Sequence, residues 1–139
     1  MKIVLDTNIL IAIIGRRSPY RWVFDRLIDG KLSLCISNEI LHEYREILAR
    51  KTSVEVSENI ANFLVINPHT FHSPIYFNFN LLSDPDDNKF VDCAVASDAM
   101  CIVSNDKHFQ QLKKIDFPRV SILTIVEFET HYRHELERR

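Results

Sequence analysis

Two carboxylates follow short apolar runs, where they could take part in catalysis. Asp6 comes directly after Ile3 to Leu5, and Asp106 follows Cys101 to Val103 after two small polar residues. An ionised acid between buried segments is costly unless it is paired or binds a cation. Sites in open α/β sheets form outside the carboxyl ends of strands. We therefore expect Asp6 and Asp106 to face each other if their strands are neighbours.

Two further acids are expected on helices. In the predicted helix 38–50, helical periodicity places Glu43 nearer the apolar face than Glu39 or Glu46. The segment DPDDNKFVDCAVASDA predicts a buried helix, in which Asp92 shares one side with two alanines.

The start of that buried helix holds three more acids. Asp84 and Asp86 stand where capping and the helix dipole favour acids, which is enough to explain them. Asp87 fits either such a role or a place in the site.

Asp6, Glu43, Asp92 and Asp106 form the candidate cluster. Four anions close together repel and raise one another's pKa, and a divalent cation removes that conflict. An all-oxygen set suits Mg²⁺ or Mn²⁺. Such centres activate water and stabilise the leaving oxygen in phosphodiester hydrolysis.

Apolar runs of strand length alternate with segments of helical period, which predicts a mostly parallel sheet with flanking helices. The cluster needs such a sheet to bring its acids together. The expected strands are 2–5, 32–36, 101–103 and 120–123, with a further edge strand at 75–79. The expected helices are 9–14, 19–29, 38–50, 54–65, 85–99, 107–113 and one that Thr124 caps.

The 139 residues suit a single domain, 1–139, with a charged tail at 133–139 that is expected to fray. No apolar run approaches the roughly 20 residues that span a membrane, and the start does not resemble a signal peptide. Three cysteines without metal-binding spacing are expected to be buried free thiols, namely Cys35, Cys93 and Cys101. We therefore expect a cytoplasmic protein that does not associate with membranes.

Charge and motifs narrow the choice of ligand. The net charge of −2 disfavours phosphate-driven binding of nucleic acid over the whole surface. It leaves room for a local basic rim, for which Arg16 and Arg17 are the substrate-binding candidates. His108 could contact a phosphate, although a solvated surface position is the preferred interpretation. Without a Walker A loop or GxGxxG, no nucleotide cofactor is expected.

Three blocks in order, IVLDTNILI, CISNEILHEYREIL and DPDDNKFVDCAVASDAMCIVSNDKHF, resemble the PIN domain family and within it the VapC-like toxins of bacterial toxin–antitoxin pairs. The resemblance covers roughly residues 1–128. It implies a Rossmann-like three-layer α/β/α fold with a mostly parallel central sheet. It also implies an Mg²⁺- or Mn²⁺-dependent endoribonuclease.

Matched position by position, the resemblance implies that the catalytic, metal-binding acids are Asp6, Glu43, Asp92 and Asp106. It implies accessory roles for Asn8, Ser37, Asp87 and Ser104. Because Asp86, Asp87 and Asp92 share one short stretch, it stays open whether Asp87 or Asp92 is the third ligand.

The resemblance also implies an RNA substrate, a cognate antitoxin and a homodimer. Tyr20, Trp22 and Phe24 could form a dimer face. Alternatively, they belong to an ordinary amphipathic helix whose core side includes Val23 and Leu27.

Two other functions were weighed. A catalytically weak PIN-like module could hold RNA or a protein without cutting it. A receiver-type or phosphatase-type phosphotransfer domain ranks last. Such domains need a second acid beside or two residues after the first, or an Asp at the end of a middle strand. Here Asn8 stands two residues after Asp6, and no Asp follows strand 32–36.

Overall fold

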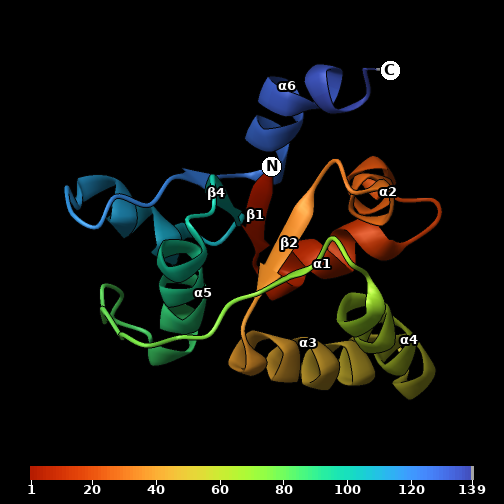
Figure 1. Ribbon diagram of the computed structural model, residues 1–139, viewed down its shortest axis with the longest axis horizontal. Coiled ribbons are helices and arrows are strands. Elements are labelled where there is room, and N and C mark those ends of the chain that lie inside the picture. The colour runs from red at the N-terminus through yellow and green to blue at the C-terminus, as the bar shows by residue number, and fades with distance from the viewer. Residues whose placement is uncertain (139) are drawn as a thin grey trace.

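The computed structural model describes residues 1–138 and contains a five-stranded parallel sheet with strand order β3-β2-β1-β4-β5. The strands are β1 (Lys2–Leu5), β2 (Ser33–Ile36), β3 (Phe71–His72), β4 (Cys101–Val103) and β5 (Ile122–Leu123). Figure 1 shows β1 near the centre of the molecule, between β2 and β4. The expected neighbours, β1 and β4, are therefore paired.

Helices cover the sheet on both faces. They are α1 (Thr7–Ile14), α2 (Arg21–Asp29), α3 (Asn38–Lys51), α4 (Val54–Ile66), α5 (Pro85–Ser97), the 3₁₀ helix η1 (Lys107–Lys114) and α6 (Ile125–Leu136). Right-handed connections place α1 to α4 on one face and α5 on the other, because the chain reverses its direction across the sheet after β3. In Figure 1, α5 and α4 lie on opposite sides of the molecule, with β2 between them in the view. The three-layer α/β/α prediction is confirmed.

The strands are apolar because both of their faces are covered, as is typical of parallel sheets. Ile3, Val4 and Leu5 of β1 are fully buried. Several helices begin where a hydroxyl side chain accepts a backbone N–H, as Ser37 does at the start of α3. Its Oγ accepts from Ile40 N at 3.3 Å.

The expected edge strand at 75–79 is wrong. Those residues are irregular, and the sheet edge is instead the short β3. Tyr76 and Phe77 are exposed, so an alternating pattern there does not bury one face. Phe79 donates its backbone N–H to a side chain of α5 rather than to a neighbouring strand.

Several element boundaries also differ. Helix α1 begins at Thr7, two residues before the expected start at Ile9, with Asp6 at its N-cap position. Helix α2 begins at Arg21, because Ser18 closes a turn in which its carbonyl accepts the N–H of Arg21. At the C-terminal end, α6 extends to Leu136, whose side chain is buried. The expected fraying at 133–139 is therefore wrong as far as Leu136, and Arg139 lies outside the described residues.

The aromatic side chains of α2 are part of the core. Trp22 and Phe24 are each only 6% exposed, and Val23 and Leu27 are buried beside them. Trp22 stacks on Phe128 of α6 with ring centroids 6.0 Å apart. The amphipathic-helix interpretation is therefore confirmed for α2. All three cysteines are buried free thiols, as predicted.

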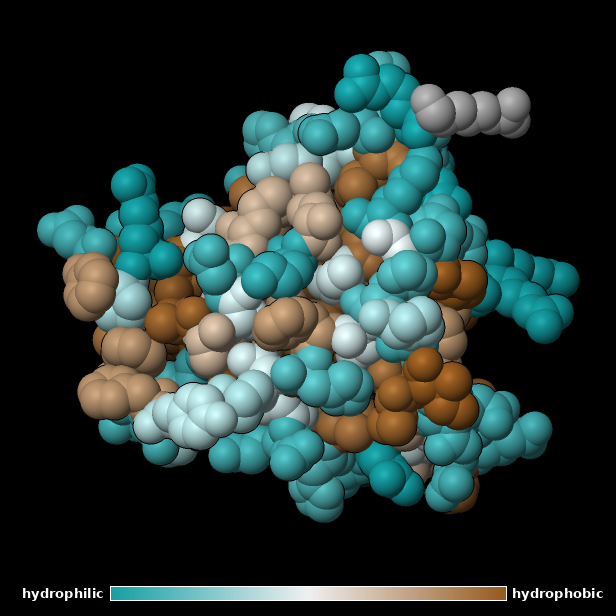
Figure 2. Space-filling view, in the orientation of Figure 1, coloured by the Kyte–Doolittle hydropathy of each residue, from teal (hydrophilic) through white to brown (hydrophobic). Residues whose placement is uncertain are grey.

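The surface mixes polar and apolar side chains. Figure 2 shows hydrophilic residues spread over the viewed face, with hydrophobic areas between them. Among the exposed apolar side chains are Val65 and Ile66 at the end of α4. Within residues 1–138, no helix combines the length and apolar character that crossing a membrane requires.

Helix α6 offers a direct stability test. Thr124 Oγ1 accepts the N–H of Glu127, and Glu127 accepts the N–H of Thr124, which together form a capping box. Thr124→Ala is expected to lower the free energy of unfolding by about 1 kcal/mol, measured by urea denaturation. Thr130→Ala, in the exposed part of the same helix, should change it by less than half as much. Equal losses in the two variants would show that the capping box does not stabilise α6.

Candidate functional site

The centre of the site lies where β1 and β4 end side by side. Leu5 pairs with Val103, so Asp6 and Ser104 follow at adjacent strand ends. Ser104 is fully buried, and its hydroxyl donates to Asp6 Oδ2 at 2.9 Å. Ser104 Oγ in turn accepts the backbone N–H of Asp106 at 3.0 Å. One hydroxyl group therefore fixes both acids at this edge.

Glu43 reaches this edge from α3. The neighbouring Tyr44 is buried and donates its hydroxyl to the carbonyl of Leu5 at 2.5 Å, which ties α3 to the end of β1. Glu43 Oε2 accepts from the hydroxyl of Thr7, and Glu43 Oε1 lies 2.8 Å from Lys89 Nζ. Glu43 is partly buried, whereas Glu39 and Glu46 are exposed, as the helical periodicity predicted.

Asp87, in the first turn of α5, completes the group. Carboxylate oxygens of Asp87 and Asp106 and a ring nitrogen of His108 all lie within 4.8 Å of one another. His108 Nδ1 is 3.4 Å from Asp106 Oδ1 and 3.9 Å from Asp87 Oδ2. Asp87 Oδ2 is buried and has no hydrogen-bond partner among the described residues. It is therefore a buried carboxylate oxygen without a hydrogen bond, with a ring nitrogen of His108 3.9 Å away.

The pKa shifts show that these carboxylates share one region. Burial raises the pKa of Asp6, and the charges of Asp106 and Glu43 raise it further, while hydrogen bonds from Ser104 and the Thr7 N–H act in the opposite direction. The carboxylates of Asp106 and Glu43 therefore lie near enough to Asp6, and those of Asp6 and Asp106 near enough to Asp87, for their charges to act on these two acids.

The pKa shift of Asp87 matters more for ligand binding than that of Asp6. Burial first, and then the charges of Asp84, Asp106 and Asp6, raise its pKa to about 6, against a smaller lowering by His108. A site that repels its own charges in this way is stabilised by a cation.

Asp92 lies elsewhere. It is five residues beyond Asp87 in α5, which corresponds to roughly 7 Å along the helix and a rotation of about 140°. Asp92 is buried, and its Oδ1 accepts the backbone N–H of Phe79 at 3.0 Å. Burial raises its pKa, the Phe79 N–H lowers it, and the charge of Glu39 raises it further. The structure thus brings Asp87, rather than Asp92, to Asp6 and Asp106.

The other predicted residues have mixed positions. Asn8 is exposed and accepts from Lys51 Nζ at 3.1 Å, and Ser37 caps α3. Neither side chain is hydrogen-bonded to Asp6 in the described structure. Arg16 and Arg17 are exposed beyond the far end of α1 from Asp6. Of the accessory set, Ser104 and Asp87 lie within the centre.

Sequence reasoning missed Thr7 and Lys89, which both contact Glu43. Thr7 follows Asp6 directly in the sequence, and this adjacency was the signal that could have placed its hydroxyl beside the site. No spacing signal identifies Lys89, because the direction of a long side chain is not set by its position on a helix.

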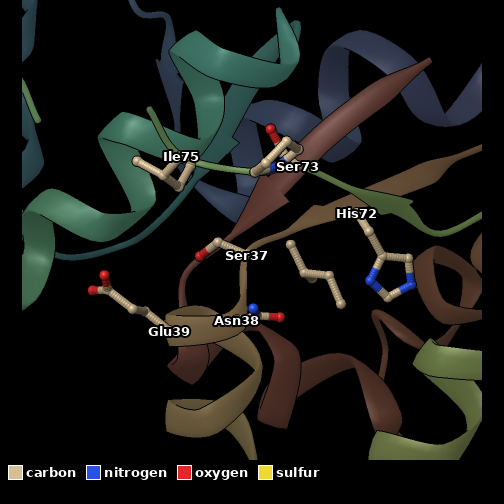
Figure 3. A pocket seen from close by; sticks show the side chains of 8 residues that line it. Ser37, Asn38, Glu39, His72, Ser73 and Ile75 are labelled. Atoms are coloured by element: carbon tan, nitrogen blue, oxygen red, sulfur yellow. The ribbon is translucent and has the colours of Figure 1, made fainter. Parts of the chain in front are cut away.

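A pocket of about 390 Å³ lies beside this centre, at the ends of β2 and β3. Figure 3 shows Ser37, Asn38 and Glu39 on one side of it and His72, Ser73 and Ile75 on the other. Its lining belongs to residues 36–39 and 72–75 and leaves out the four clustered carboxylates. The pocket and the acidic centre are therefore neighbouring but separate features.

The residues present fit a hard divalent cation. Carboxylate oxygens are the donors that Mg²⁺ and Mn²⁺ prefer. The buried oxygen of Asp87 without a hydrogen-bond partner supplies one such donor. Asp6 and Asp106 supply others, held in place by Ser104.

The pKa of Asp87 predicts how metal binding depends on pH. The metal-free carboxyl ionises near pH 6, and a cation binds only its ionised form. Affinity for Mn²⁺, measured by calorimetry, should rise with pH through this value and then level off, with about a tenfold fall per unit below it. An affinity that stays constant between pH 5 and 7 would contradict a ligand role for Asp87.

Known proteins resemble this chain in sequence and in fold. The chain is 29% identical over 128 residues to uncharacterized protein MJ1680 of Methanocaldococcus jannaschii, covering 81% of this chain and 76% of that protein. Its fold is similar to a chain of VapBC2 from Rickettsia felis, solved bound to a promoter DNA fragment, with TM-score 0.62, 17% identity and coverage of 89% and 98%. DNA-bound VapBC from Salmonella typhimurium gives TM-score 0.55, 14% identity and coverage of 90% and 98%.

The family comparison covers most of the chain. The family model described as PIN domain matches residues 2–108, a range that includes all four clustered carboxylates. Together with the parallel sheet and the acids at its carboxyl edge, this match shows that the chain belongs to the PIN domain family.

Proposed function

We propose that this protein is a metal-dependent endoribonuclease that hydrolyses phosphodiester bonds with Mg²⁺ or Mn²⁺. The observation that carries the proposal is the convergence of four carboxylates at one sheet edge, with a buried Asp87 oxygen that lacks a partner. Acids placed this way repel one another unless a cation is bound. RNA as the substrate comes from the resemblance to VapC-like proteins.

In this proposal the protein provides the ligands and their orientation. Asp6, Asp87 and Asp106 bind the cation through carboxylate oxygens, and Ser104 holds Asp6 and the backbone of Asp106 in register. Lys89 holds Glu43 in place through an ion pair, with Lys89 Nζ 2.8 Å from Glu43 Oε1. When bound, the cation supplies an activated water and charge stabilisation for the leaving oxygen.

We further propose that the protein is the toxin of a toxin–antitoxin pair and acts in the cytoplasm. The similarity in fold to chains of two VapBC assemblies supports this assignment. A cognate antitoxin would then be the protein partner, and self-association as a homodimer is part of the same proposal. Co-purification with the product of an adjacent gene, followed by loss of nuclease activity on reassociation, would support it.

The direct test compares wild type with Asp6→Asn on single-stranded RNA and on DNA of the same sequence. Cleavage is expected only for RNA, only with Mg²⁺ or Mn²⁺, and only by the wild type. Equal cleavage by both proteins would indicate a contaminating nuclease. Binding of RNA without cleavage under every metal condition would favour the non-catalytic module.

A further inference from the structure

Lys89 is held firmly beside the acidic centre. Its side chain is only 12% exposed, and its Nζ lies 2.8 Å from Glu43 Oε1 and 2.7 Å from the carbonyl oxygen of Asp86. The ammonium group also lies 5.5 Å from the centroid of the Phe90 ring. A lysine with these partners is a fixed cation rather than a mobile surface charge.

The centre therefore has two unlike ends. At one end, both oxygens of Glu43 already have partners, namely the Thr7 hydroxyl and Lys89. At the other end, oxygens of Asp87 and Asp106 lie close together, and Asp87 Oδ2 has no hydrogen-bond partner within residues 1–138. Of the two ends, the second therefore presents a buried carboxylate oxygen that makes no hydrogen bond to the described residues.

Charge repulsion points the same way. A second divalent ion at Glu43 would lie beside the largely buried ammonium group of Lys89, which is unfavourable where the effective dielectric constant is low.

We propose that Lys89 takes the place of a second metal ion beside Glu43, so that the centre binds a single divalent ion at Asp6, Asp87 and Asp106. The inference rests on the proposed metal-dependent function and specifies its stoichiometry. It makes Lys89 a positioning residue, which holds Glu43 through an ion pair and excludes a cation from that end.

The test counts bound Mn²⁺ without RNA, by electron paramagnetic resonance at neutral pH and saturating metal. Wild type is expected to bind one Mn²⁺ per chain with an uncoupled spectrum. Lys89→Met keeps most of the side-chain length without the charge and is expected to bind two. Because two ions on neighbouring carboxylates couple their spins, the second ion at Glu43 should give a coupled spectrum, which a remote adventitious site would not.

Two controls separate the local effect from the loss of charge. Lys89→Arg keeps the cation and should bind one Mn²⁺. Lys114→Met removes a charge from an exposed position in η1 and should also bind one. A coupled pair in wild type would overturn the inference while leaving the metal site intact, and so would a single ion in Lys89→Met that folds normally. If wild type binds no Mn²⁺ at all, the proposed function fails and this inference fails with it.

Discussion

Asp87→Asn is expected to abolish tight Mn²⁺ binding and to lower the rate of RNA cleavage by at least about 100-fold. The reason is that Asp87 Oδ2 is buried without a hydrogen-bond partner, at the end of the centre where Asp87 and Asp106 lie close together. The same change should leave the metal-free protein at least as stable as wild type. The ionised Asp87 is destabilising above its raised pKa of about 6, because the folded state disfavours its charge, and a neutral amide removes that repulsion.

The matched control is Asp92→Asn, in the same helix. An amide oxygen at position 92 can still accept the N–H of Phe79, so the contact between α5 and the preceding loop is retained. Calorimetry with Mn²⁺ and a cleavage assay should both give values close to wild type. If Asp92→Asn loses the metal and Asp87→Asn keeps it, the assignment of the third ligand made here is reversed.

The largest effect on stability is expected for Phe109→Ala. Phe109 of η1 is fully buried, and its ring meets that of Phe90 edge-on, with centroids 6.2 Å apart. Removing a buried aromatic ring of this kind costs about 3–5 kcal/mol of unfolding free energy. Because this pair packs η1 against α5, the change should also weaken Mn²⁺ binding by separating Asp106 from Asp87.

Urea denaturation measures the loss of stability in Phe109→Ala, and calorimetry measures its affinity for Mn²⁺. Phe109→Leu fills part of the same space and should lose much less stability. Tyr76→Ala truncates an aromatic side chain that is 90% exposed and should fall within about 0.5 kcal/mol of wild type. A loss below 1 kcal/mol in Phe109→Ala would show that the two rings do not hold η1 to α5.

The strands and their acids were predictable because the physical signal is local. The apolar runs ending at Leu5 and Val103 identify β1 and β4, and the polar residues directly after them must then lie at the carboxyl edge. The position of Glu43 followed from helical periodicity, since only one side of α3 faces the sheet.

The third acid needed information that periodicity does not carry. Periodicity places Asp92 on a buried side of α5. A residue on a buried side of a helix can still lie away from the acidic centre. The helix begins at the carboxyl edge of the sheet and runs away from it, so only its first turn, with Asp87, remains at the centre. Asp92 instead holds the irregular segment before α5, a contact with no local sequence signal.

The most direct measurement is the anomalous diffraction of a crystal grown or soaked with Mn²⁺. We expect one peak in contact with carboxylate oxygens of Asp6, Asp87 and Asp106, with Lys89 still paired to Glu43. A peak bound by Asp92, or no peak among these carboxylates at saturating Mn²⁺, would contradict it.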